Sequence, residues 1–189
     1  MNTVLIASGI FLVNAFFLAV AYQLPQSIQE DNIYENVQVL CLFISMVIFL
    51  YAAVSRDFKS VAFISAVTCF LFILRELNVE SFDIPHIFIL LFSGTGKKIL
   101  FAFLILLSLY FLKNSYGIKH IIKSFIPDMN PFIISLGILF VISWVFDKKI
   151  FDIQYNLLFE ELAETNAYFI IIAAAMFFNM KYTLDKGDR

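Results

Sequence analysis

The stretch SVAFISAVTCFLFILRE, residues 60–76, decides how the rest of this sequence is interpreted. It contains 15 consecutive uncharged residues and then Arg75 and Glu76, with no Gly or Pro to mark the end of a helix. A helix of 15 residues is roughly 22 Å long, whereas the hydrocarbon core of a bilayer is about 30 Å thick. If this stretch crosses a membrane, it must include either Arg56 and Lys59 at one end or Arg75 and Glu76 at the other.

The composition of the whole chain indicates a membrane protein. Of its 189 residues, 61% are hydrophobic and only 15% are charged, 24 are Phe, and the mean hydropathy is +0.89. A soluble domain of this size could not bury so much apolar surface. The net charge of -2 excludes the broad basic surface that a nucleic-acid partner requires. Cys41 and Cys69 lie in apolar runs without C-x-x-C spacing, which is typical of buried structural cysteines.

Apolar runs predict an all-α, polytopic membrane protein: one domain, a bundle of six transmembrane helices with short interfacial or re-entrant helices. The runs lie near residues 3–23, 36–54, 58–79, 97–113, 131–147 and 157–180, and each approaches the ~20 residues that a membrane helix needs. Lys and Arg are more frequent in the loops on the side of the two termini, eight against four. This asymmetry predicts that both termini are cytoplasmic, and we expect the plasma membrane, a bacterial inner membrane, as the location.

Two shorter segments are expected at the membrane surface. Residues 118–125 place apolar side chains on one helical face and basic ones on the other, as in interfacial helices. Residues 82–92 are too few to cross a bilayer. They predict an outward re-entrant or interfacial helix, with Gly94 and Gly96 permitting a sharp reversal before Lys97.

Polar residues flank four of the predicted spans on the side opposite the termini, where the uncharged runs are too short to cross alone. This places at one depth, near the outer leaflet, Glu35, Gln38, Arg75, Glu76, Lys98, Glu160, Glu161 and Glu164. Charges at membrane depth cost a few kcal/mol each, and they normally face the bundle and pair. These residues either form an ion-paired pocket open to the outside or lie at the headgroup level, with Lys and Arg reaching phosphates. We predict the pocket, because carboxylates gain little from a phosphate-rich interface.

Helical spacing assigns these residues to faces. Glu35, Gln38, Leu42 and Ser45 share one face of the second helix, and Glu161, Glu164, Thr165 and Tyr168 share one face of the last. Arg75 is predicted to lie inside the bilayer boundary and to form a bidentate pair with Glu161 or Glu164. Glu76 is expected to be a poor partner for a bidentate pair with Arg75, because neighbouring residues point about 100° apart around a helix.

A ligand site follows from this convergence. Its predicted ligand-binding residues are Glu35, Gln38, Arg75, Glu76, His86, Lys97, Lys98, Glu160 and Tyr168. In this hypothesis Arg75, Lys97 and Lys98 hold an anionic head group, and Glu161 or Glu164 is the candidate catalytic acid or base.

Known motifs are mostly excluded. SGTGKK, residues 93–98, has Leu91 where a phosphate loop needs its first Gly, and Lys98 where it needs Ser or Thr. FEELAET, residues 159–165, is similar to the E-E-x-x-x-R motif of membrane-embedded CAAX-type proteases, but Thr165 replaces the Arg. With two His in the chain, the two-histidine metal sites of such hydrolases cannot be built. We predict no metal and no cofactor; a weak alternative is a carboxylate-rich site that includes His86.

The layout resembles a set of uncharacterised bacterial six-helix membrane proteins. The matching pieces are Glu35 with Gln38, Arg75 with Glu76, and Glu160 with Glu161. The resemblance implies a six-helix fold and brings no established activity.

The residues themselves predict a protein that binds or processes a lipid-linked or small polar ligand, with membrane lipids as partners. One alternative is an accessory subunit of a membrane complex, with a membrane-protein partner or a second copy of the chain. The other is a small transporter or proton conduit, although the inner half supplies few polar residues apart from Asn14.

Overall fold

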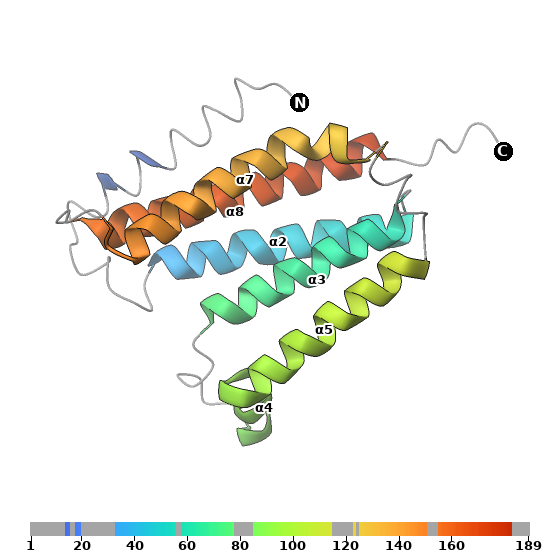
Figure 1. Ribbon diagram of the computed structural model, residues 1–189, viewed down its shortest axis with the longest axis horizontal. Helices are drawn as coiled ribbons and strands as arrows, with labels where there is room; N and C mark the ends of the chain where they lie inside the picture. The colour runs from blue at the N-terminus through green and yellow to red at the C-terminus, as the bar shows by residue number, and fades with distance from the viewer. Residues whose placement is uncertain are drawn as a thin grey trace.

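The computed structural model describes residues 14–15, 18–19, 33–55, 58–77, 85–114, 123, 125–150 and 155–182. Within these residues every regular element is helical, which confirms the all-α class (Figure 1). The elements are α2 (Ile33–Ser55), α3 (Lys59–Glu76), α4 (His86–Phe92), α5 (Gly94–Asn114), α7 (Ile126–Asp147) and α8 (Asn156–Lys181).

Four of the described helices are long and apolar enough to cross a membrane: Tyr34–Val54 of α2, Gly94–Phe111 of α5, and all of α7 and α8. α3 has 18 residues, but Lys59, Arg75 and Glu76 lie within it. The first predicted span, 3–23, falls almost entirely outside the described residues, as does most of the predicted amphipathic helix 118–125. The structure therefore supports four crossing helices, and the six-span count stays a prediction.

Helix α8 is the centre of the bundle. It packs against α2 on one side and α7 on another, while α3 packs on α2 and α5 packs on α3 (Figure 1). Small side chains at Ala163, Ala167, Ala174 and Ala175 are buried along α8, and small residues let helix backbones approach closely. The apolar window of α5 has no buried residue, against 61% of the window of α8. α5 therefore lies at the edge of the bundle.

Aromatic rings close the end of the bundle where α3 and α7 begin and α8 ends. Phe58, Phe125, Phe178 and Tyr182 form one cluster, with ring centroids 5.0 to 6.0 Å apart. Phe58 has a φ of 56°, a backbone conformation that costs non-glycine residues energy and persists where packing imposes it.

A polar contact lies beside this aromatic cluster. Asp128 forms an ion pair with Lys181, Oδ1 to Nζ 2.5 Å, and accepts a hydrogen bond from the Tyr182 hydroxyl at 2.8 Å. Burial raises the pKa of the Tyr182 phenol, and the hydrogen bond to Asp128 and its charge raise it further. The contact fastens the start of α7 to the end of α8.

Helix α4 is separate from α5, as predicted for residues 82–92. Ser93 is extended and Gly94 has a φ of 48°, so the chain turns sharply between the two helices. A Cβ on Gly96 would lie 2.0 Å from the Leu90 carbonyl oxygen, so only glycine allows α4 to approach α5 this closely. The depth of α4 in a membrane stays a prediction.

Two predicted helix starts are corrected. α5 begins at Gly94 rather than at residue 97, and α7 begins at Ile126 rather than at residue 131. Pro127 stands in the first turn of α7, where proline is favoured because its missing N–H needs no intrahelical partner. Pro131 then continues the helix instead of starting it.

Candidate functional site

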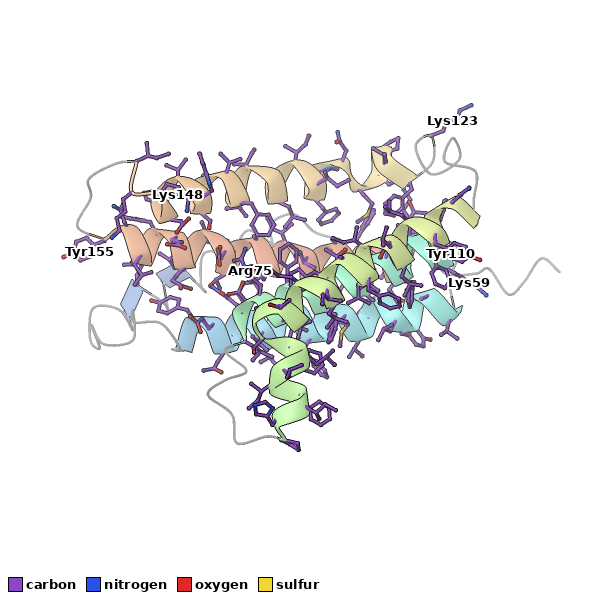
Figure 2. The ribbon with its side chains drawn as sticks, turned by 60° about the horizontal axis from the view of Figure 1, so that its bottom comes forward. Lys59, Arg75, Tyr110, Lys123, Lys148 and Tyr155 are labelled. Atoms are coloured by element: carbon purple, nitrogen blue, oxygen red, sulfur yellow. The ribbon has the colours of Figure 1, made fainter. Side chains whose placement is uncertain are left out.

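Polar side chains gather at the end of the bundle where α2 and α8 begin and α3 and α7 end, here called the polar end. Figure 2 places Lys148 and Tyr155 at this end, Lys59, Tyr110 and Lys123 at the other, and Arg75 between them. Arg75 lies this far in because α3 is short: its 18 residues extend roughly 27 Å, whereas the 26 residues of α8 extend roughly 39 Å.

Arg75 is the centre of an ion-paired network. Its Nη2 lies 2.6 Å from Glu164 Oε1, and its Nε lies 2.9 Å from Glu76 Oε1. Ser143 donates a hydrogen bond to Glu164 at 2.8 Å, and the Tyr168 hydroxyl donates one to Glu76 at 2.6 Å. These five residues from α3, α7 and α8 are called the Arg75 network. The predicted pairing of Arg75 with a carboxylate of the last helix is confirmed, and Glu164 is that carboxylate.

Glu76 contacts Arg75 through one nitrogen, Nε, and so does not form the bidentate pair that the sequence disfavours. Instead of forming one bidentate pair, Arg75 contacts two carboxylates, Glu76 through Nε and Glu164 through Nη2. The Tyr168 hydroxyl holds the Glu76 carboxylate against α8, where Arg75 Nε also contacts it. Tertiary contacts therefore override the 100° separation along the helix.

The Arg75 network carries more negative than positive charge. The side chains of Glu76 and Glu164 are 10% and 11% exposed, whereas that of Arg75 is 43% exposed. Two nearly buried carboxylates thus share one guanidinium. Lys97 lies beside the network and reaches the Arg75 carbonyl oxygen at 3.5 Å.

A second polar cluster lies on the other side of α8, at the α2 interface. The fully buried Gln38 donates hydrogen bonds to Glu161 Oε2 at 2.8 Å and to Thr165 Oγ1 at 3.2 Å. The Gln38 Oε1 atom is buried without a hydrogen-bond partner among the described residues. These three residues are called the Gln38 cluster.

The predicted face of α8, on which Glu161 and Glu164 lie, is divided between the Gln38 cluster and the Arg75 network. Glu161 and Glu164 are three positions apart and point about 60° apart around the helix. Glu161 consequently faces α2 and Glu164 faces α3 and α7. The predicted inner face of α2 is confirmed, since Gln38, Leu42 and Ser45 are fully buried.

A cavity of about 520 Å³ opens beside the Arg75 network. It lies between α3, α7 and α8, and its lining residues are Phe72, Arg75, Phe140, Ser143, Trp144, Asp147, Glu160 and Glu164. The lining contains one cation and three carboxylates, together with an indole ring. Asp147 pairs with Lys148 at 2.6 Å, and hydrogen bonding to that carboxylate raises the pKa of Lys148.

The predicted site residues separate into three groups. Arg75, Glu160 and Glu164 line the cavity, and Glu76 and Tyr168 support it through the network. Gln38 and Glu161 belong to the α2 interface, where Glu35 is half-buried in the first turn of α2. His86 and Lys98 are exposed on α4 and α5, outside the cavity lining.

Of the two candidate catalytic acids, only Glu164 lines the cavity. Its Oε1 already accepts from Ser143 and pairs with Arg75. That arrangement occupies the carboxylate with two partners and fixes its position, which suits binding better than proton transfer.

Five cavity residues escaped the sequence analysis: Phe72, Phe140, Ser143, Trp144 and Asp147. Ser143 and Asp147 are four residues apart in an otherwise apolar run, so they lie on one helical face. Their four-residue spacing was the feature of the sequence that could have identified these two residues as cavity residues.

Comparison with protein-family models, with curated proteins and with solved structures finds no match for this chain. Among the described residues, no group of three or more His, Cys, Asp and Glu is arranged to hold a metal ion.

Proposed function

We propose that this protein is a multi-pass membrane protein that binds an amphiphilic ligand, with the ligand's head group in the cavity at the polar end. The observation that carries this proposal is the lining of that cavity, in which charged side chains from α3, α7 and α8 converge between apolar helices. Charged residues inside a membrane bundle are costly and mark binding sites more often than surface ones do.

The charges favour a head group with an ammonium group. Arg75 is already shared by two carboxylates, and Glu160 makes no ion pair among the described residues. Glu160 and the ring of Trp144 suit a cation, which carboxylates and indole faces both attract, whereas Asp147 already pairs with Lys148. The remaining N–H groups of Arg75 are available to a phosphate, so a zwitterionic head group also fits.

The head group test compares two lipids in the same bilayer. Protein in phosphatidylglycerol nanodiscs is titrated with fluorescent phosphatidylethanolamine and, separately, with its N-acetylated form. We expect the acetylated lipid to bind about tenfold more weakly, since hydrogen bonds to charged groups contribute about 1.5–3 kcal/mol. Glu160→Gln should weaken binding of the ethanolamine lipid by a similar factor. Glu35→Gln removes a carboxylate outside the cavity lining and should leave it unchanged. Equal affinity for both lipids, with no effect of Glu160→Gln, would refute the proposal.

The six-span topology, with both termini cytoplasmic in a bacterial inner membrane, belongs to this proposal. It is supported by the alternating directions of the described helices, which put the start of α3 and the end of α8 on one side and the polar end on the other. In a variant without Cys41 and Cys69, single cysteines at Ser27 and Ser81 should react with an impermeant maleimide on intact cells. Cysteines at Lys59 and Ser115 should not. Labelling at Lys59 would reverse the orientation.

The alternative function, a small transporter or proton conduit, has less support than ligand binding. Among the described residues, polar contacts of α8 with its neighbours extend from Glu161 to Tyr168, and the pair of Lys181 with Asp128 lies at the opposite end of the bundle. Beyond Phe72 and Phe140 the space between α3 and α7 is lined mainly by apolar side chains. A proton or ion path would need polar groups there.

A further inference from the structure

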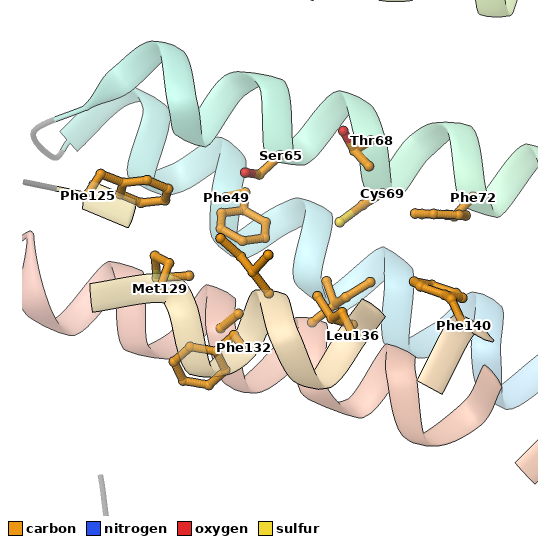
Figure 3. A pocket seen from close by; sticks show the side chains of 13 residues that line it. Phe49, Ser65, Thr68, Cys69, Phe72, Phe125, Met129, Phe132, Leu136 and Phe140 are labelled. Atoms are coloured by element: carbon orange, nitrogen blue, oxygen red, sulfur yellow. The ribbon is translucent and has the colours of Figure 1, made fainter. Parts of the chain in front are cut away.

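An apolar groove runs along the bundle next to the polar cavity. Its volume is about 280 Å³, and α3 and α7 form its two walls, with residues of α2 and α8 at its floor (Figure 3). Ser65, Thr68, Cys69 and Phe72 line it from α3. Met129, Phe132, Ile133, Leu136 and Phe140 line it from α7.

The two stripes have helical spacing and continue into the polar cavity. On α3 the groove residues fall at i, i+3, i+4 and i+7 from Ser65, and Arg75 follows three residues after Phe72. On α7 Ser143 follows three residues after Phe140. One face of each helix therefore lines the groove in its first part and the cavity in its last turns.

Phe72 and Phe140 belong to both spaces. Their rings stack with centroids 5.5 Å apart and planes 17° apart, and the Phe72 ring also lies 5.9 Å from the guanidinium carbon of Arg75. This ring pair marks the point at which a charged lining changes to an apolar one.

The groove has the length of one lipid tail. From Met129 to Phe140 the α7 wall covers 11 residue steps, or roughly 16 Å. One leaflet contributes about half of the ~30 Å hydrocarbon core. Ile133 is 48% exposed and Thr68 is also exposed, so the rim of the groove reaches the bundle surface, where a tail can enter sideways.

We infer that the groove holds a hydrocarbon tail of the ligand whose head group occupies the cavity, so that cavity and groove form one site for a lipid with an ammonium-bearing head group. This inference rests on the proposed function and adds the position of the tail. Moving a tail from bilayer to groove gains little free energy, because lipid tails are as apolar as the groove. The groove therefore orients the ligand, and the cavity charges select it.

The test maps where the tail lies. The probe is a single-chain lysophosphatidylethanolamine with a photoreactive diazirine in the middle of its tail, in phosphatidylglycerol nanodiscs with the full-length protein. After irradiation, peptide mass spectrometry should find the label on groove residues, in particular Phe132, Leu136 and Thr68. A probe with the same tail and a glycerol head group should label these positions about tenfold less.

Matched tryptophan variants separate the groove from the lipid-facing surface. Leu136→Trp fills the groove and should reduce labelling there by about tenfold, the size expected when a bulky side chain overfills a site. Ile138→Trp changes the same helix at a side chain that is 57% exposed and lies outside the groove, so it should have no effect. If Leu136→Trp does not fold, the label positions in the unmodified protein decide the question.

The two proposals fail in different ways. Label spread over exposed residues such as Ile138 and Leu109, with ethanolamine-lipid binding still sensitive to Glu160→Gln, would overturn the tail position and leave the cavity proposal intact. Groove labelling that is equal for both head groups and insensitive to Glu160→Gln would mean that ordinary bilayer lipid fills the groove. That result would overturn the single-site inference and contradict the proposed function.

Discussion

The Gln38 cluster and the Arg75 network lie on two sides of α8. They show that one helix can both form a packed helix interface and line a candidate binding site. In the Gln38 cluster, Glu161 meets an amide and lies at a closed interface with α2. In the Arg75 network, Glu164 meets a guanidinium and a hydroxyl and borders a cavity of about 520 Å³. The carboxylates are three residues apart, so the neighbours of α8 determine the difference.

Side-chain size explains why one side is closed and the other is open. On the α2 side, Leu158 and Leu162 of α8 pack with Tyr34 of α2, and all three side chains are buried, so they fill the interface. On the other side, the stacked rings of Phe72 and Phe140 stand between α3 and α7. Since α3 ends at Glu76, no side chain of α3 beyond that residue fills the space beside the last turn of α7. A cavity remains there.

The largest predicted effect concerns the open side. Arg75→Ala leaves Glu76 and Glu164 nearly buried without their shared cation, so it should reduce the free energy of unfolding by about 3 kcal/mol. This value is at the low end for a broken buried pair because Arg75 is 43% exposed. The measurement is thermal unfolding in detergent, and Lys148→Ala, which breaks an exposed pair, should leave stability nearly unchanged, because exposed ion pairs contribute little.

Double variants identify the carboxylate responsible. Adding Glu164→Gln to Arg75→Ala should recover part of the lost stability, because it removes one of the unpaired charges. Adding Glu161→Gln should recover none, since Glu161 belongs to the Gln38 cluster. Equal recovery by both would mean that the two groups are one network.

The closed side should respond less and independently. Gln38→Leu fills the same space with an apolar side chain but removes the hydrogen-bond donor to Glu161 and Thr165. We expect this change to lower the free energy of unfolding by about 2 kcal/mol. Its effect should add to that of Arg75→Ala within about 0.5 kcal/mol, as expected for sites without shared partners. A larger deviation in unfolding experiments would show that α8 couples the two sides.

The smallest effect is expected on a third side of α8, where Asn166 and Asn14 donate hydrogen bonds to each other at 2.9 and 3.0 Å. Hydrogen bonds between membrane helices contribute about 0.6 kcal/mol on average, so Asn166→Ala should lower stability by roughly that amount. Asn14→Ala alone should have a similar effect, and the double variant should lose little more than either single one. Full additivity would show that the amide pair contributes nothing by itself.

The sequence by itself determined the all-α class, the apolar helices and the set of polar residues at one end. These follow from hydrophobic run lengths and from the cost of placing charges at membrane depth, both of which are local properties of the chain. It also required a partner for Arg75, because the 15 uncharged residues before it are too few to cross a bilayer.

The tertiary structure decided which carboxylates Arg75 meets, and that Glu161 and Glu164 face different neighbours. It also brought Ser143, Trp144 and Asp147 to the cavity and joined the cavity to an apolar groove at Phe72 and Phe140. Helical spacing gives the direction of a side chain to within a broad face, but the helix that covers this face depends on packing between distant segments. Whether that packing leaves a space depends on where each helix ends and on the rings between them.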